Sequence, residues 1–113
     1  MANVRSSNGN ARRKLRAWLR AQQRPCWICQ AFGRDGTIDY SLPFGHPYSF
    51  EVDELVPVSK GGSPIDRGNV DATHRCCNQW RGNKSVATVL AMARQGASGS
   101  KQQPVSVATS RTW

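Results

Sequence analysis

The stretch "SFEVDELVPVSKGG", residues 49–62, carries two adjacent carboxylates, Asp53 and Glu54, within an apolar run. Its first part, "SFEV", alternates in polarity and predicts a short strand with Phe50 and Val52 on one face. The following "LVPVS" predicts a second extended piece, made irregular by its proline. Neighbouring side chains on a strand point to opposite faces, so the two acids can share a site only if the strand breaks beside them. The proline that follows favours such a break.

The chain around this stretch is strongly basic. Its 113 residues include 16 Lys and Arg against 7 Asp and Glu, which gives a formal net charge of +9. All the acids lie between Asp35 and Asp71, and residues 1–34 and 72–113 contain none. This distribution is typical of a protein whose flanks hold a polyanion while its centre performs cation-dependent chemistry. The alternative is a basic chain that its charge merely keeps soluble.

The length leaves room for one small domain with a thin core, which a metal ion or disulfides would have to support. No apolar run approaches the roughly 20 residues that cross a bilayer, and the N-terminus lacks the apolar segment of a secretory signal. We therefore expect a cytosolic protein without membrane contact. In that compartment its four cysteines favour metal binding over disulfides.

Turn residues and apolar spacing divide the chain into segments, of which residues 10–95 are expected to form the domain. The helix in its first part has an apolar face and an arginine stripe. The expected segments are a disordered stretch over 1–9, a basic helix over 11–22 capped by Asn10, a turn-rich connection over 30–48 with room for a short hairpin, helices over about 70–81 and 85–95, and a flexible tail over 96–113.

Two closely spaced pairs of side chains predict a zinc site. Cys26 and Cys29 form a CxxC pair, and "ATHRCCNQW" supplies His74, Cys76 and Cys77. His74 and Cys77 repeat the two-residue spacing and lie near one helix face, whereas Cys76 has only a poorly spaced partner. We therefore assign Cys26, Cys29, His74 and Cys77 to one structural zinc ion, with Cys76 in place of His74 as the alternative. A redox CxxC is disfavoured because no βαβ pattern surrounds it.

An arginine stripe runs along the N-terminal helix. Arg12, Arg16 and Arg20 follow one another at i, i+4 spacing, which disfavours a helix by a few tenths of a kcal/mol per pair. No acid on this helix offsets the repulsion, whereas phosphate groups would. The stripe therefore indicates a DNA contact or, alternatively, a solvated helix face.

In their order and spacing, these motifs resemble the HNH endonuclease family, in the zinc-knuckle branch common among phage and prophage proteins. The matching segments are "CWIC", "EVDELVPVSKGGS", "NVDATHRCCN" and "RGNK", within roughly residues 12–86. The resemblance implies an α+β fold with a small ββα-metal core, a zinc knuckle, a basic N-terminal helix and a flexible C-terminal tail. It also implies a metal-dependent DNA endonuclease that nicks or cuts duplex DNA in the cytoplasm of a bacterial host.

The resemblance also implies the roles of individual residues. By position, Asp53 and Asn78 match ligands of a catalytic divalent cation, and their hard oxygen donors suit Mg²⁺ or Mn²⁺. Asn69 matches the residue that holds the catalytic loop and orients the base, although it could also simply cap a helix. The family's usual base is a histidine after the aspartate, and here that position is Glu54. We expect Glu54 to activate water or to add a ligand, with His46 as the alternative base.

DNA is the expected partner, and a phage terminase-like packaging protein is a further candidate. Contacts to phosphates position DNA and imply little choice of sequence. The rival interpretation is a non-catalytic, zinc-stapled DNA-binding module that acts in phage DNA packaging or assembly. In both cases the residues expected to follow the DNA backbone are Arg12, Arg16, Arg20, Arg75, Arg81 and Lys84.

Overall fold

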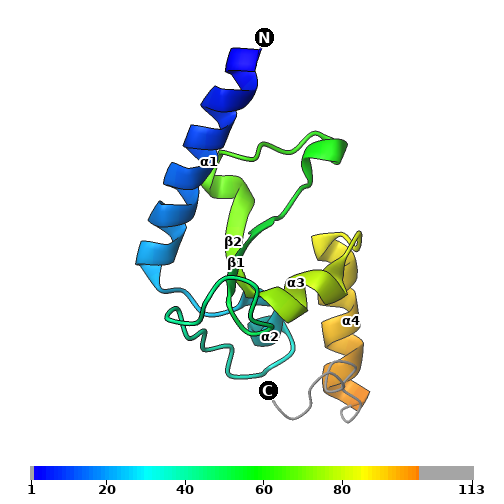
Figure 1. Cartoon of the computed structure of the whole chain (residues 1–113). Coiled ribbons are helices and arrows are strands. Elements are labelled where there is room, and N and C mark those ends of the chain that lie inside the picture. The colour runs from blue at the N-terminus through cyan, green and yellow to red at the C-terminus, as the bar shows by residue number, and fades with distance from the viewer. Residues whose placement is uncertain (1, 100–113) are drawn as a thin grey trace.

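The computed structural model describes residues 2–99, with the backbone alone at residues 2–8 and 97–99. It is a small mixed structure of helices and one two-stranded antiparallel sheet (Figure 1). Among the described residues, no helix has the length and apolar character needed to span a membrane. The elements in chain order are α1 (Ala2–Gln22), α2 (Trp27–Ala31), β1 (Phe50–Glu54), two 3-10 turns (Val58–Lys60 and Arg67–Asn69), β2 (Val70–His74), α3 (Arg75–Arg81) and α4 (Val86–Gly99).

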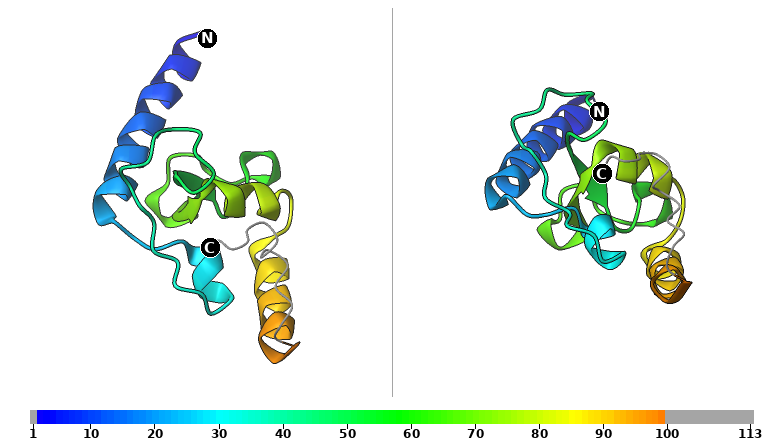
Figure 2. Two further views of the ribbon diagram at one scale, coloured as in Figure 1. Left: turned by 60° about the horizontal axis from the view of Figure 1, so that its bottom comes forward. Right: turned by 90° about the horizontal axis from the view of Figure 1, so that it is seen from below.

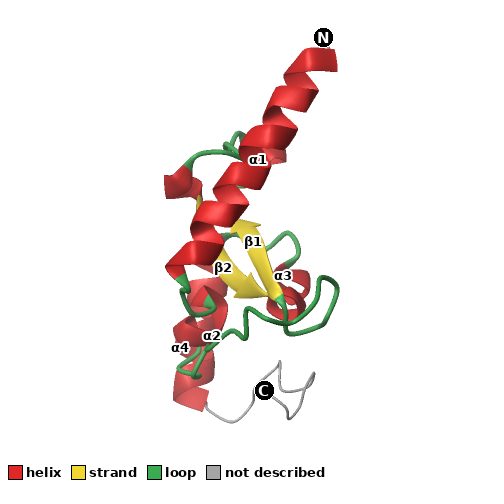
Figure 3. Cartoon of the chain, turned by 60° about the vertical axis from the view of Figure 1, so that its left-hand side comes forward, coloured by secondary structure: helices red, strands yellow, loops and turns green. Residues whose placement is uncertain are grey.

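Helix α1 begins at Ala2 and not at Ala11 as predicted, so the expected disorder of residues 2–9 is not observed. Gly9 costs a helix about 1 kcal/mol relative to alanine, but no proline stops the helix there. The predicted apolar face is confirmed, because Leu15 and Leu19 are buried and Trp18 packs against the core. The sheet lies between α1 on one side and α3 on the other (Figures 1 and 3).

The first strand was predicted correctly and the second was not. β1 pairs with Val70–His74, with Phe50 opposite His74 and Glu54 opposite Val70. The predicted helix over 70–81 therefore exists only as α3, from Arg75 onward. In the segment before it, Val70, Ala72 and His74 alternate along the strand and are buried. Pairing with β1 satisfies the backbone of this segment, and this outweighs its weak helical pattern.

The "LVPVS" piece, expected to be extended, leads instead into the 3-10 turn over Val58–Lys60. Val56 and Val58 are exposed, so no buried face holds this segment in a sheet. The connection predicted over 30–48, which is described throughout, begins with the last two residues of α2 and then forms turns without a hairpin. Both segments are loops that flank the sheet.

The final helix, α4, confirms the prediction over 85–95 and extends it to Gly99. Ser85 caps its start, since the Ser85 hydroxyl accepts a hydrogen bond from the Thr88 backbone N–H at 3.0 Å. Residues 96–99 therefore belong to a helix and not to the predicted tail, whose remainder, 100–113, lies outside the described residues. In both views of Figure 2, α4 lies on the opposite side of the molecule from α1.

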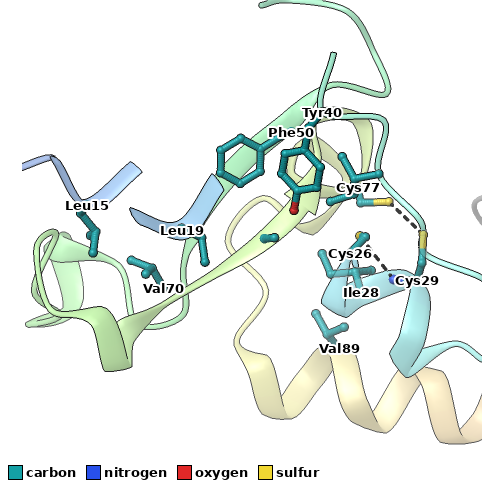
Figure 4. Packing of buried hydrophobic residues seen from close by; sticks show 12 residues of the cluster. Leu15, Leu19, Cys26, Ile28, Cys29, Tyr40, Phe50, Val70, Cys77 and Val89 are labelled. Carbon is teal, nitrogen blue, oxygen red and sulfur yellow. Dashed lines mark hydrogen bonds between the residues drawn. The ribbon is translucent and has the colours of Figure 1, made fainter. Parts of the chain in front are cut away.

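The core joins all of these elements around the predicted metal ligands. Leu19 of α1, Ile28 of α2 and Val89 of α4 are each at most 1% exposed. The rings of Tyr40 and Phe50 pack 5.0 Å apart beside them, as Figure 4 shows. The sulfur atoms of the cluster are thus part of the hydrophobic core, as expected for a chain of this length.

Gly62 makes the loop after β1 sensitive to a single methyl group. A Cβ at Gly62 would lie 1.7 Å from the carbonyl oxygen of Val56. We predict that Gly62→Ala lowers the free energy of unfolding by about 1–3 kcal/mol because the backbone must move. The matched control is Gly68→Ala, where the added Cβ would meet only the Asp66 carboxylate at 3.4 Å. Urea unfolding of both variants measures the difference, and equal stabilities would contradict this account.

Candidate functional site

Four buried side chains from separate parts of the chain converge on one point. The ligand atoms of Cys26, Cys29, His74 and Cys77 all lie within 4.8 Å of one another. The Cys29 sulfur is 3.6 Å from His74 Nδ1 and 3.7 Å from the Cys77 sulfur. Ligands bound tetrahedrally to zinc are separated by roughly 3.5–3.8 Å, given their bond lengths. The cluster could therefore hold a structural metal ion such as zinc.

Local structure brings these ligands together. Cys26 is the N-cap of α2, and its sulfur accepts a hydrogen bond from the Cys29 backbone N–H at 3.5 Å. His74 closes β2 and is the N-cap of α3, which carries Cys77. Figure 4 shows the three sulfur atoms gathered beside α2. The cluster thus joins α2 to the sheet and to α3.

The surroundings of His74 orient it as a ligand. Its Nε2 lies 3.0 Å from the Thr37 carbonyl oxygen, which can only accept a hydrogen bond. Nε2 therefore carries a hydrogen, and Nδ1 is the nitrogen that faces the sulfur atoms and could bind a metal ion. A carbonyl partner of this kind commonly fixes metal-binding histidines. Hydrogen bonds from Cys29 and Cys77 lower the pKa of the Cys26 thiol, whereas those with Cys26 and Cys29 raise the pKa of Cys77, so Cys26 is the thiol of this pair that ionises first.

Cys76 lies outside the cluster. It is half-buried, and the group of side chains that could hold a metal contains His74 in its place. His74, the last residue of β2, is buried in the core. Cys76 is the second residue of α3, and its backbone N–H donates to the Pro47 carbonyl oxygen. The alternative assignment with Cys76 as a ligand is therefore not the arrangement observed.

Asp53 is buried in a network that connects β1 with α2 and α3. Its Oδ2 accepts hydrogen bonds from Trp27 Nε1 at 2.7 Å and from Arg81 Nη1 at 2.5 Å. The same arginine donates to the carbonyl oxygens of Glu54, Leu55 and Lys84. Burial raises the pKa of Asp53, whereas Trp27 and Arg81 favour its charged form. Arg81 is thus the buried counter-charge of Asp53.

A polar hollow of about 210 Å³ opens beside this network. Its walls include the predicted ligands Asp53 and Asn78 together with Glu54 and Arg81. The Asn78 amide nitrogen donates to Glu51 Oε1 at 3.0 Å, so the amide oxygen is the atom that remains to ligate a cation. The hollow therefore brings together the three residues for which the sequence predicted metal-dependent chemistry.

Glu54 ends β1 and contributes to the wall of the hollow, but the strand does not break before it, so its side chain points to the opposite face from that of Asp53. It leans toward α1, and its carboxylate is 3.9 Å from the Arg12 guanidinium. His46, the alternative base, does not line this hollow. It lies in the loop before β1, and its Nδ1 accepts a hydrogen bond from the Tyr48 backbone N–H at 3.0 Å.

Asn69 connects the two ends of the loop between the strands. Its Oδ1 accepts from the Val56 N–H, and its Nδ2 donates to the carbonyl oxygens of Val56 and Ser63, each at 2.9 Å. No helix begins after Asn69, so the simple helix-cap role considered for it is wrong. The side chain instead holds the loop that follows Glu54.

Sequence reasoning missed Glu51, which lies two residues before Asp53 on the same face of β1. Glu51 bonds both Asn78 and Arg75, the latter at 2.9 Å. The period of two along a strand was the signal that could have found it. Glu51 orients the Asn78 amide toward the hollow and neutralises Arg75.

The basic side chains expected on DNA are placed unequally. Arg12 and Arg20 are exposed, and Arg16, Arg75 and Lys84 are partly exposed. Arg81 is only 2% exposed, so its predicted role on the DNA backbone is wrong, because its guanidinium is enclosed by Asp53 and three carbonyl groups. Arg16 lies over the ring of Phe50 and Arg20 over that of Tyr40. The stripe therefore lies along the body of the protein and is not a fully solvated face.

Comparisons with known proteins do not place the chain in a family. No family model, no curated protein and no solved structure matches it. The resemblance to HNH endonucleases therefore stays a prediction from sequence motifs, and the geometry of the two sites is what bears on function.

The Asp53–Arg81 pair yields a stability prediction. Removing one buried charge leaves the other unpaired, which typically costs about 3–5 kcal/mol, whereas replacing both is often close to neutral. We therefore expect Arg81→Met to destabilise the protein more than the double variant Asp53→Leu, Arg81→Met. Denaturant unfolding of the zinc-loaded proteins compares them. If Arg81→Met lowers the free energy of unfolding by less than about 1 kcal/mol, the ion pair is solvated and does not stabilise the fold.

Proposed function

We propose that this chain is a zinc-stabilised, metal-dependent DNA endonuclease of the HNH type, acting in a phage or prophage context. The observation that carries the proposal is the hollow that brings Asp53, Glu54 and Asn78 together at the end of β1. Further support comes from the order β1, β2, α3 and from the Cys26–Cys29–His74–Cys77 cluster beside it. The proposed partner is duplex DNA.

The donor set fits a hard divalent cation such as Mg²⁺ or Mn²⁺. Asp53 offers a carboxylate oxygen, Oδ1, beside the one that Arg81 and Trp27 bond, and Asn78 offers its amide oxygen. Oxygen donors of this kind suit these cations better than zinc. When bound there, a cation would supply stabilisation of the charge that develops on the phosphate oxygens.

The chain's own residues would perform the remaining steps. The Glu54 carboxylate accepts a proton from the attacking water, whose oxygen bonds to the phosphorus atom in line with the leaving oxygen. The bond from phosphorus to the leaving oxygen breaks, and that oxygen takes up a proton from solvent. Asn69 holds the loop after Glu54, and Glu51 holds the Asn78 amide. Arg12, Arg16, Arg20, Arg75 and Lys84 are the side chains proposed to contact phosphate groups and position the duplex.

One observation favours the rival function, a non-catalytic DNA-binding module for packaging or assembly. Arg81 already neutralises Asp53 within the core, so this carboxylate has a structural role that needs no metal. In the nuclease, by contrast, the cation shares Asp53 with Arg81. The two functions thus differ in whether the hollow binds a cation.

Manganese binding tests this difference. We expect the zinc-loaded chain, mixed with a short duplex, to bind one further Mn²⁺ in electron paramagnetic resonance titrations, and Mg²⁺ to displace it. Asn78→Ala should remove this ion while zinc content stays unchanged. If the unsubstituted chain binds DNA and zinc but no Mn²⁺, the nuclease proposal fails and the binding module remains.

A further inference from the structure

Phe44 is an exposed aromatic side chain that the core does not explain. It is 85% exposed, the highest value among the exposed large hydrophobic side chains of the described residues. Single exposed apolar residues are common on protein surfaces and need no function of their own. Phe44 differs in two respects. A tight turn fixes its backbone, and arginines lie around its ring.

The rigid presentation comes from a tight turn. The His46 N–H donates to the Pro43 carbonyl oxygen at 3.1 Å, and Gly45 has a φ of 92°. These features define a type II turn with Phe44 at its second position and a glycine where a positive φ is required. The loop is anchored just after the turn, where backbone N–H groups of α3 donate to Pro47 and Ser49. The ring is therefore held away from the body by a fixed backbone.

Three arginines lie around the ring, together with the carboxylates of Glu51 and Glu54. The Arg75 guanidinium lies 5.9 Å from the ring centroid. Phe44 also lines a hollow of about 220 Å³ together with Arg12, Arg16 and Glu54. Phe44 thus shares one hollow with Glu54, which also lines the hollow that contains Asp53 and Asn78.

An aromatic ring among arginines suits a nucleic acid whose base has left the stack. The ring offers a surface for the base, and the guanidinium groups match the flanking phosphates. In a fully paired duplex the base faces are stacked on neighbouring bases, so the ring cannot contact them. We infer that Phe44 stacks on an unpaired base, and that the preferred ligand is duplex DNA with an unpaired nucleotide beside the phosphate that faces Glu54. This inference rests on the DNA-binding part of the proposed function.

The test uses two otherwise identical duplexes, one fully paired and one with a single unpaired 2-aminopurine in its centre. Stacking of one base on an aromatic side chain changes affinity by about 5- to 150-fold. Without added divalent cation, we expect the zinc-loaded chain to bind the second duplex about tenfold more tightly and to quench its 2-aminopurine fluorescence. Phe44→Ala should lose both effects and change affinity for the paired duplex less than about twofold.

Two variants complete the experiment. Phe44→Trp keeps an aromatic ring and should retain the preference, whereas Leu90→Ala removes an exposed apolar side chain of α4 and should change nothing. Equal binding of the two duplexes, or an equal loss for both in Phe44→Ala, would overturn the inference. Failure of the proposed function would give a different result. The chain would bind neither duplex, or it would prefer the duplex with the unpaired base but cleave no DNA.

Discussion

Cys29→Ser is expected to release the metal ion and unfold the chain. The Cys29 sulfur lies within 3.7 Å of both His74 Nδ1 and the Cys77 sulfur, so its loss opens the cluster. Structural zinc contributes on the order of 10 kcal/mol to the folding of a small domain, which is comparable to the entire stability of most proteins. Circular dichroism and elemental analysis should therefore report loss of helix together with loss of zinc, and His74→Ala should behave in the same way.

The neighbouring thiol provides a matched control. Cys76 carries the same chemical group one residue from Cys77, but it lies outside the cluster. Cys76→Ser should therefore keep one zinc ion per chain and change stability by about 1 kcal/mol or less, because the side chain is only half-buried and the substitution is nearly isosteric. If Cys76→Ser lost the metal while His74→Ala retained it, the ligand assignment would be wrong.

Glu54→Gln is expected to reduce DNA cleavage by about 10²- to 10⁴-fold, the usual contribution of a general base. Glutamine keeps the shape of the glutamate side chain, but its neutral amide does not act as a base near neutral pH. The Glu54 side chain is partly exposed and its ion pair with Arg12 is long, so it adds little to stability. Zinc content, unfolding free energy and affinity for DNA should therefore remain as in the unsubstituted chain.

His46→Ala is the control for this prediction. His46 bonds within its own loop and does not line the hollow, so its removal should leave the cleavage rate within about twofold. Single-turnover cleavage of a labelled duplex measures both variants. An inactive His46→Ala beside an active Glu54→Gln would transfer the role of base to His46.

The cluster of Cys26, Cys29, His74 and Cys77 could be predicted from sequence because its signal is local. Two pairs with a two-residue spacing each define half of a tetrahedral site, and the fold only has to bring the halves together. The apolar face of α1 is equally local, since Leu15 and Leu19 reveal it by helical spacing. These predictions agree with the structure.

The second strand and Arg81 could not be predicted in the same way. Residues 70–74 are too short to distinguish a strand from the start of a helix, and only pairing with β1 decides between them. Its basic charge alone predicts a DNA contact for Arg81. Its burial depends on Asp53, which is distant in sequence, and no local pattern reveals such a pair.

The most direct test of the proposed function is the fate of supercoiled plasmid mixed with the zinc-loaded chain in the presence of Mg²⁺ or Mn²⁺. If Asp53, Glu54 and Asn78 form the active site, the plasmid becomes nicked or linear. These products should form only when the cation is added, and they should be nearly absent with Glu54→Gln. Plasmid that is bound, as judged by a gel shift, but stays supercoiled with every cation would contradict the nuclease and leave a zinc-stabilised DNA-binding module.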